Sequence, residues 1–153
     1  MARSIRLAVL TGLLAALVIG TGTVFAGPGD NNKLVNASLT GLPQAFVNQF
    51  LVGVKGGGHP WALEEGNARL GRDGHLDLNV HGLVLFPEGN NPVTSGRAIV
   101  SCNGGADIVQ SDVVPFDPSG DAHVNQFLTL PRQCLAPTIF FTTASGVWLA
   151  VSG

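Results

Sequence analysis

Polar and apolar residues alternate most clearly between Trp61 and Leu85. The second half of this stretch sets Leu76, Leu78 and Val80 on one parity against His75, Asp77, Asn79 and His81 on the other. Successive side chains of a β-strand face opposite sides of a sheet, so this alternation predicts a strand with one face in the core and one face toward water. Before it, Gly71–Gly74 contains two glycines and an aspartate, which favour the conformations of a tight turn. The stretch therefore predicts a β-hairpin.

The first half of the stretch changes parity within its length. Trp61 and Leu63 are apolar at odd positions, whereas Ala68 and Leu70 are apolar at even positions. The change falls near Glu65–Gly66, and glycine inside a strand often marks a β-bulge. We therefore expect a bulge at this point of the first strand.

Further short apolar or alternating segments, separated by turn residues, predict more strands. They are Leu34–Thr40, Leu83–Phe86, Arg97–Asn103, Ile108–Phe116, Ala122–Leu130, Thr138–Thr143 and Val147–Val151. Leu42–Leu51 stays open between a helix, indicated by apolar residues at helical spacing, and a strand that begins at Phe50. About eight short strands with regular turn signals predict an all-β protein, an antiparallel β-sandwich of immunoglobulin-like or related type.

The N-terminal residues have the layout of a secretory signal peptide. Arg3 and Arg6 precede an apolar run, and Val24-Phe25-Ala26 places small enough residues for cleavage after Ala26. The alternative is a retained membrane anchor over residues 7–26. We expect a signal peptide over residues 1–26, a flexible lead-in over 27–41, which includes the short strand suggested above, and a β-sandwich domain over 42–153.

Charge excludes two classes of partner. The whole chain has eight basic and ten acidic side chains, and loss of Arg3 and Arg6 with the signal peptide leaves six basic ones, a formal net charge of −4. Nucleic acids and anionic membrane surfaces attract basic patches, which this sequence lacks. The expected partner is therefore an unidentified extracellular or cell-surface one, with membrane contact only through an uncleaved signal segment.

Both cysteines, Cys102 and Cys134, follow the signal segment. An even number of cysteines in an exported chain favours a disulfide, and two buried free thiols are the alternative.

Three runs carry a resemblance to a known group of proteins. They are GNARLGRDGHLDLNVHGLVL (66–85), LTLPRQCLAP (128–137) and Gly57-Gly58-His59-Pro60-Trp61. Together they resemble small secreted proteins of actinobacterial type whose function is uncharacterised, over roughly Val52–Gly153. The resemblance implies export, a β-sandwich and paired cysteines, and it assigns no active residue.

The polar face of the predicted second hairpin strand is a candidate metal site. His75 and Asp77 stand about 6.6 Å apart along a strand, close enough to share an ion, whereas His75 and His81 are about 20 Å apart and too distant. His123 is the only strand histidine that offers a third ligand, and only if its strand lies beside the hairpin. The alternative is a solvated polar face, which antiparallel sheets commonly present.

Other chemistry is weakly indicated. Asp117-Pro118-Ser119-Gly120-Asp121 spaces its oxygens as calcium loops do, but lacks their distal glutamate and matches an ordinary turn. Glu64 and Glu65 are adjacent and face opposite sides of a strand, so they do not form a glycosidase pair. Trp61 and Trp148 lie among apolar residues and are expected in the core rather than on a sugar-binding surface.

The sequence therefore predicts an exported, non-enzymatic β-sandwich module with a structural or binding role, without catalytic residues or a cofactor. The alternative is a small secreted metal-dependent hydrolase that uses the polar face of the central hairpin, with His75, Asp77 and His123 as weak candidate ligands.

Overall fold

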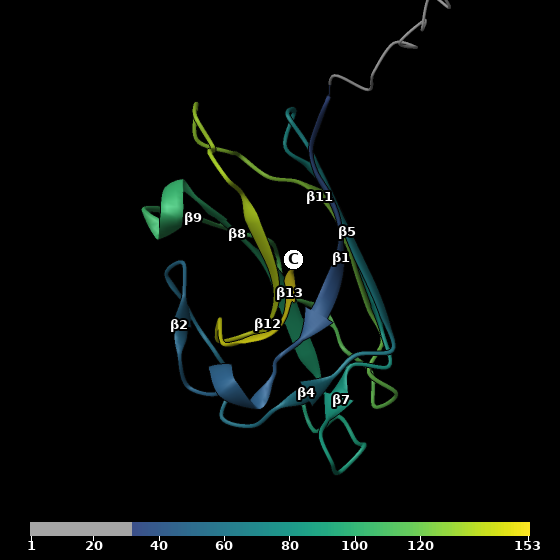
Figure 1. The fold of residues 1–153 in the computed structure, drawn as a ribbon. Coiled ribbons are helices and arrows are strands. Elements are labelled where there is room, and N and C mark those ends of the chain that lie inside the picture. Colours follow the sequence, from purple (N-terminus) through teal and green to yellow (C-terminus); the bar gives the residue numbers. More distant parts are fainter. Residues whose placement is uncertain (1–31) are drawn as a thin grey trace, which may run out of the picture.

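Thirteen β-strands and two short 3₁₀ helices follow one another through residues 32–153, the part of the chain described by this computed structural model (Figure 1). The all-β prediction is confirmed. The expected signal peptide and its cleavage after Ala26 lie outside the described residues. Within the described part, no helix is long and apolar enough to cross a membrane. The elements are β1 (Lys33–Gly41), η1 (Gln44–Phe46), β2 (Phe50–Leu51), β3 (Val54–Lys55), β4 (Trp61–Ala62), β5 (Glu65–Gly71), β6 (His75–His81), β7 (Val84–Leu85), β8 (Ser95–Cys102), η2 (Asn103–Gly105), β9 (Asp107–Gln110), β10 (Val114–Pro115), β11 (Ala122–Phe127), β12 (Thr138–Thr143) and β13 (Trp148–Ser152).

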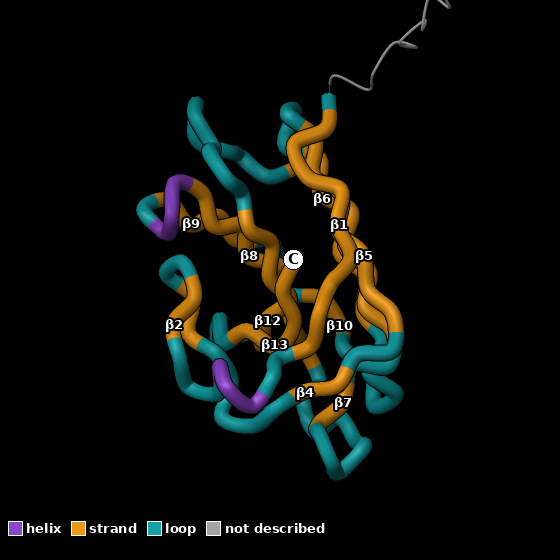
Figure 2. The backbone as a smooth tube through the Cα atoms, viewed as in Figure 1, coloured by secondary structure: helices purple, strands orange, loops and turns teal. Residues whose placement is uncertain are grey.

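One continuous antiparallel sheet forms the body of the protein. Its order is β10-β8-β12-β13-β1-β5-β6-β11, with β9 as an additional partner of β8. Residues 33–38 of β1 pair with β5 and residues 39–41 pair with β13, so a single strand joins the two walls visible in Figure 2. The predicted β-sandwich is therefore corrected: the main sheet is a strongly curled half-barrel of eight strands rather than two stacked sheets.

The position of β1 also corrects the expected domain boundary. The strand expected at Leu34–Thr40 is present, and it occupies the middle of the sheet order. The flexible lead-in expected over 27–41 is therefore wrong for residues 33–41, which belong to the folded domain. Lys33–Gly41 alternates only loosely in polarity, which is why its central place was not evident from its own pattern.

The central hairpin has the predicted second strand and turn but a different first strand. β5 pairs with β6 in continuous register from Glu65 opposite His81 to Leu70 opposite Leu76. The chain leaves strand conformation at Leu63 and Glu64, so the expected bulge near Glu65 is a break between two strands. Trp61 accordingly lies in β4, which pairs with β7 in a separate two-stranded ribbon. At the turn, Gly74 has a φ of 86°, and a β-carbon there would collide with the carbonyl oxygen of Leu128.

The concave side of the curled sheet encloses the core. Leu76, Leu78 and Val80 of β6 are buried, as the alternation predicts, and so are both tryptophans. Phe116 lies at the centre of an aromatic group, with its ring 5.0 Å from that of Phe141 and 6.2 Å from that of Trp61 (centroid distances). The largest fully buried side chains are Trp148, Phe116, Phe140, Phe141, Leu42, Leu70, Leu76, Leu78, Leu83, Ile139, Leu149 and Val100.

Two segments with mixed sequence signals divide into shorter elements. Leu42–Leu51, open between helix and strand, contains the 3₁₀ helix η1 followed by the short strand β2. The strand expected over Ile108–Phe116 is split into β9 and β10, and Ser111 between them accepts a hydrogen bond from the Ala98 amide at 2.8 Å.

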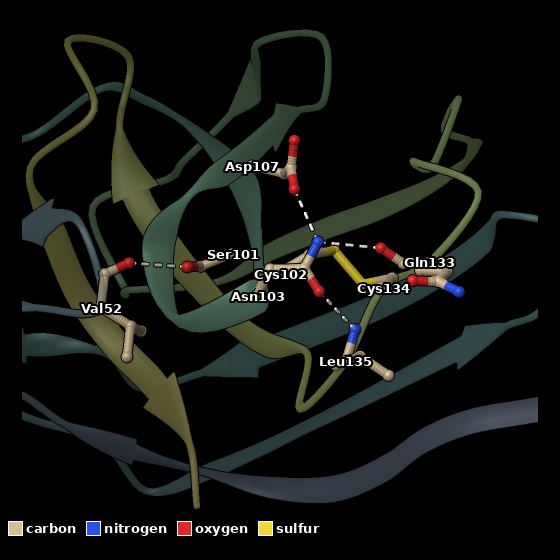
Figure 3. The surroundings of a disulfide bond; sticks show 8 residues. All are labelled: Val52, Ser101, Cys102, Asn103, Asp107, Gln133, Cys134 and Leu135. Carbon is tan, nitrogen blue, oxygen red and sulfur yellow. Dashed lines mark hydrogen bonds between the residues drawn. A yellow bond between two sulfur atoms is a disulfide. The ribbon is translucent and has the colours of Figure 1, made fainter.

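A disulfide closes one end of the half-barrel. Cys102 at the end of β8 is bonded to Cys134 in the loop that follows β11, which confirms the predicted pair (Figure 3). Beside it, the Asn103 side chain donates to the Gln133 carbonyl at 2.9 Å and accepts from the Leu135 amide at 3.0 Å. The disulfide and Asn103 therefore hold the 128–137 loop against the end of β8.

Candidate functional site

A polar surface covers the convex side of four neighbouring strands, β1, β5, β6 and β11. We name it the amide-histidine face. Strand alternation places the apolar partners of these residues in the core and leaves this set facing solvent, half-buried or exposed. Its members are Asn36, Ser38, Asn67, Arg69, His75, Asp77, Asn79, His81, His123, Asn125 and Phe127.

The register arranges these side chains in rows across the strands. One row is Asn36, Arg69, Asp77 and Asn125, and the next is Ser38, Asn67, Asn79 and His123. Neighbouring strands lie about 4.8 Å apart, so each row spans roughly 14 Å across the four strands. The face therefore presents amide, imidazole and charged groups in a fixed two-dimensional pattern.

Hydrogen bonds connect β6 to β11 on this face. Oδ1 of Asp77 accepts from Nδ2 of Asn79 at 2.9 Å and lies 3.3 Å from Nε2 of His123. One row away, Nε2 of His75 lies 3.2 Å from Oδ1 of Asn125. These contacts fix the two imidazole rings without covering them, since the side chain of His123 is 54% exposed.

An aromatic ring stands exposed at one end of the face. Phe127 is 70% exposed, although it is a large apolar side chain on a regular strand. Its ring centroid lies 4.9 Å from that of His75, with the two planes tilted by 37°. One side of the phenyl ring therefore has an imidazole beside it, which is in turn held by Asn125.

The other end of the face has a histidine between two carboxylates. Nδ1 of His81 lies 2.7 Å from Oδ1 of Asp121, and its Nε2 lies 3.6 Å from Oε2 of Glu64. The same Asp121 oxygen accepts the Gly82 amide at 2.9 Å. A shallow hollow of about 520 Å³ lies beside this pair, and the side chains of Asn79 and His123 contribute to its lining.

The structure brings the candidate metal ligands together only in part. β11 is the neighbour of β6, so the condition set for His123 is met. His123 meets Asp77, but His75 contacts Asn125 instead of Asp77. In residues 32–153, no group of three or more His, Cys, Asp or Glu side chains is arranged to hold a metal ion.

The Asp117–Asp121 segment is a turn closed by its own aspartate. Oδ1 of Asp117 accepts from the hydroxyl and the amide of Ser119 and from the amide of Asp121, at 2.6, 2.9 and 3.0 Å. The Ser119 hydroxyl, followed by the Asp121 amide, lowers the pKa of the Asp117 carboxyl, because these bonds favour its charged form. The carboxylate is thus used within the turn, as the turn interpretation predicts, and it positions Asp121 for His81.

A second hollow, of about 360 Å³, lies at the disulfide end. Leu34, Leu130 and Leu135 provide apolar lining, with Arg132 at its side. The loop that forms it is the one held by Cys134 and Asn103.

Sequence reasoning missed several members of the amide-histidine face. Arg69 and Asn125 carry no signal of their own, because only the register shows that they flank Asp77. Phe127 did carry a signal: it lies among the polar positions of its strand, with His123 and Asn125, where an apolar residue is unexpected.

Searches of protein-family models, of curated proteins and of solved structures found no match to this chain.

Proposed function

We propose that this chain is an exported, non-enzymatic β-module that binds an extracellular or cell-surface ligand on the amide-histidine face. The observation that carries the proposal is the exposed ring of Phe127 beside a hydrogen-bonded polar network. A large apolar side chain in water gains nothing for folding, and exposed aromatic side chains are enriched at binding surfaces.

Export is the second part of the proposal. It is supported by the pattern of Arg3, Arg6 and the apolar run that ends at Ala26, and by the resemblance to small secreted proteins of actinobacterial type. The disulfide between Cys102 and Cys134 is consistent with an oxidising compartment. In this proposal the mature chain begins at Gly27.

A metal-dependent or acid-base hydrolase is the second candidate function. Two histidine-carboxylate contacts favour it, His123 with Asp77 and His81 with Asp121, and both histidines line the same hollow. Such pairs can accept and return protons during hydrolysis. Elemental analysis of the purified protein, and hydrolase screens with and without chelator, separate this candidate from the binding module.

The binding proposal is tested by co-sedimentation with insoluble envelope material from the organism that makes the protein. The informative variant is Phe127→Ser, and its matched control is Phe50→Ser, because Phe50 is also 70% exposed but lies on β2, away from the face (Figure 2). We expect the wild type and the control to sediment, and Phe127→Ser to stay in solution. Equal sedimentation of both variants would show that binding, if any, does not use this face.

A further inference from the structure

We infer that the ligand of the amide-histidine face is a neutral carbohydrate chain. This inference rests on the proposed function, because it names the chemistry of the ligand bound by the same face. It is carried by three features of the face: the kinds of hydrogen-bonding groups, the exposed aromatic ring, and the shape of the surface.

The hydrogen-bonding groups match hydroxyls better than they match ions. Four of the residues are asparagines, Asn36, Asn67, Asn79 and Asn125, and each amide presents donors and an acceptor together. A sugar hydroxyl also donates once and accepts twice, so one amide can serve two neighbouring hydroxyls. Arg69 lies opposite Asp77 on the face, and Glu65 lies opposite His81. The carboxylates of Glu64 and Asp121 lie at the His81 end, so the face has no cluster of cations for an anionic ligand.

The aromatic ring of Phe127 offers an apolar surface for the C–H groups of a sugar, which hydrogen bonds to hydroxyls do not contact. The faces of a pyranose ring carry C–H groups, which pack on the flat side of an aromatic ring. Phe127 has no polar atom, so its exposed side can contribute only such apolar contact. His75 flanks it at 4.9 Å and is itself bonded to Asn125, so the stacking surface and the nearest amide are held together.

The shape favours an extended polymer over a small enclosed molecule. Six residue steps separate His75 from His81, a distance of about 20 Å along β6. Phe127 lies at the first end and the shallow hollow beside Asn79, His81 and His123 at the other. A chain of several linked sugar rings that runs along β6 would stack on Phe127 and reach this hollow.

Two other polymers fit less well. A polyanion such as nucleic acid requires clustered lysine and arginine, and Arg69 is the one such residue among those that define the face. A protein partner requires an apolar centre to its interface, whereas Phe127 is the one fully apolar side chain in the set and lies at its end. These classes are therefore outcomes that the experiment must be able to report.

The test has one arm with natural material and one with defined polymers. In the first, envelope material is treated with periodate, which cleaves vicinal diols, or with protease, before co-sedimentation. In the second, native gels contain galactomannan, xylan, β-glucan or, as an anionic comparison, polygalacturonate, and retardation gives the affinity. The variants are Phe127→Leu, which keeps an apolar group but loses the ring, Phe127→Trp, which keeps a ring, and Phe50→Leu as control.

We expect periodate, but not protease, to abolish sedimentation. At least one neutral polymer should retard the wild type, Phe127→Trp and Phe50→Leu, with at least about tenfold weaker binding by Phe127→Leu, as for loss of an aromatic contact that dominates binding. Sedimentation that still needs Phe127 but is lost to protease, or retardation by polygalacturonate alone, overturns the carbohydrate inference and leaves the binding face in place. If neither Phe127→Leu nor Phe127→Ser changes sedimentation or retardation, both the binding face and the carbohydrate inference are wrong. If no neutral polymer retards the protein and periodate treatment does not reduce sedimentation, the carbohydrate inference is wrong.

Discussion

Nδ1 of His81 and Oδ1 of Asp121 lie 2.7 Å apart, and this contact joins the end of β6 to the start of β11. The same carboxylate oxygen accepts the amide of Gly82 at 2.9 Å. Asp121 therefore holds two groups at the end of β6 at once. Because it directly precedes β11, it also helps to set the register that places His123 beside Asp77.

This arrangement predicts the tautomers of three histidines. A carboxylate or amide oxygen can only accept, so the ring nitrogen that faces it must carry the proton in the neutral imidazole. We expect Nδ1–H for His81, because its 2.7 Å contact with Asp121 is within hydrogen-bond distance whereas its Nε2 lies 3.6 Å from Glu64. We expect Nε2–H for His75, which faces Asn125, and for His123. Long-range proton-nitrogen correlation spectra distinguish the two forms. In Asp121→Ala, His81 should lose its Nδ1–H preference, and an Nε2–H form of His81 in the wild type would contradict the geometry.

The register of β6 can be tested by a pair of substitutions. Leu78 has no solvent contact, so Leu78→Ala should lower the free energy of unfolding by about 2–5 kcal/mol. The side chain of His81 is 63% exposed, and His81→Ala should cost less than about 1 kcal/mol, as for a surface ion pair. Denaturant unfolding measures both. A reversed order would mean that the strand is shifted by one residue, which exchanges its two faces.

The hairpin was predictable because its determinants are local. Alternation identifies the buried face of β6, and the glycines at 71 and 74 with Asp73 specify a tight turn within four residues. The buried set was found for the same reason. The break at Leu63 and Glu64 was read as a bulge, because a change of parity does not distinguish an inserted residue from the end of a strand.

The curled sheet and the face were not predictable, since period two reveals which side of a strand is buried but not which strands are neighbours. β1 pairs with β5 along its first part and with β13 at its end, and the sequence of Lys33–Gly41 does not indicate this change of partner. The same limit applies to the site. His123 was named as a candidate, but its contact with Asp77 depends on β11 lying beside β6, a pairing between distant segments.

The disulfide should contribute substantially to stability. Cys102 and Cys134 are separated by 32 residues, and closing such a loop restricts the unfolded chain by about 3–4 kcal/mol in the entropy model. Cys102→Ser or Cys134→Ser should therefore lower the free energy of unfolding by about 2–5 kcal/mol. Thiol titration of the denatured, unreduced wild type should find no reactive thiol, and two thiols per chain would refute the pairing.

Asn103 should be a separate determinant of the same end of the molecule. Its φ is 56°, and its amide bonds Asp107, Gln133 and Leu135. Asn103→Gly loses these bonds but adopts the positive φ without strain, whereas Asn103→Ala loses the same bonds and keeps a β-carbon at positive φ. At about 1 kcal/mol per hydrogen bond, both variants should have a clearly lower free energy of unfolding, and that of Asn103→Ala should be roughly 1 kcal/mol lower than that of Asn103→Gly. Equal losses would show that the backbone conformation is unimportant there.

The turn at Asp117 should make stability depend on acid pH. Hydrogen bonds from the Ser119 hydroxyl and the Asp121 amide lower the pKa of this carboxyl in the folded protein below its ordinary 3.8. Because the folded-state pKa is the lower one, the unfolded chain binds more protons in acid. The stabilising contribution is therefore complete above the unfolded-state pKa and is lost as pH falls through the folded-state pKa.

Ser119→Ala removes the largest cause of this shift, so the pKa of Asp117 should move up toward 3.8. The titration of its side-chain carboxyl carbon by NMR gives the midpoint directly. The stability advantage of the wild type over Ser119→Ala should be greatest near neutral pH and shrink in acid, where Asp117 is protonated in both proteins. Ser145→Ala is the matched control, because the Ser145 hydroxyl bonds the neutral hydroxyl of Thr143 at 2.8 Å, and its effect should not vary with pH through this range. An advantage of Ser119 that stays constant down to pH 2 would mean that its hydroxyl does not act through the Asp117 carboxylate.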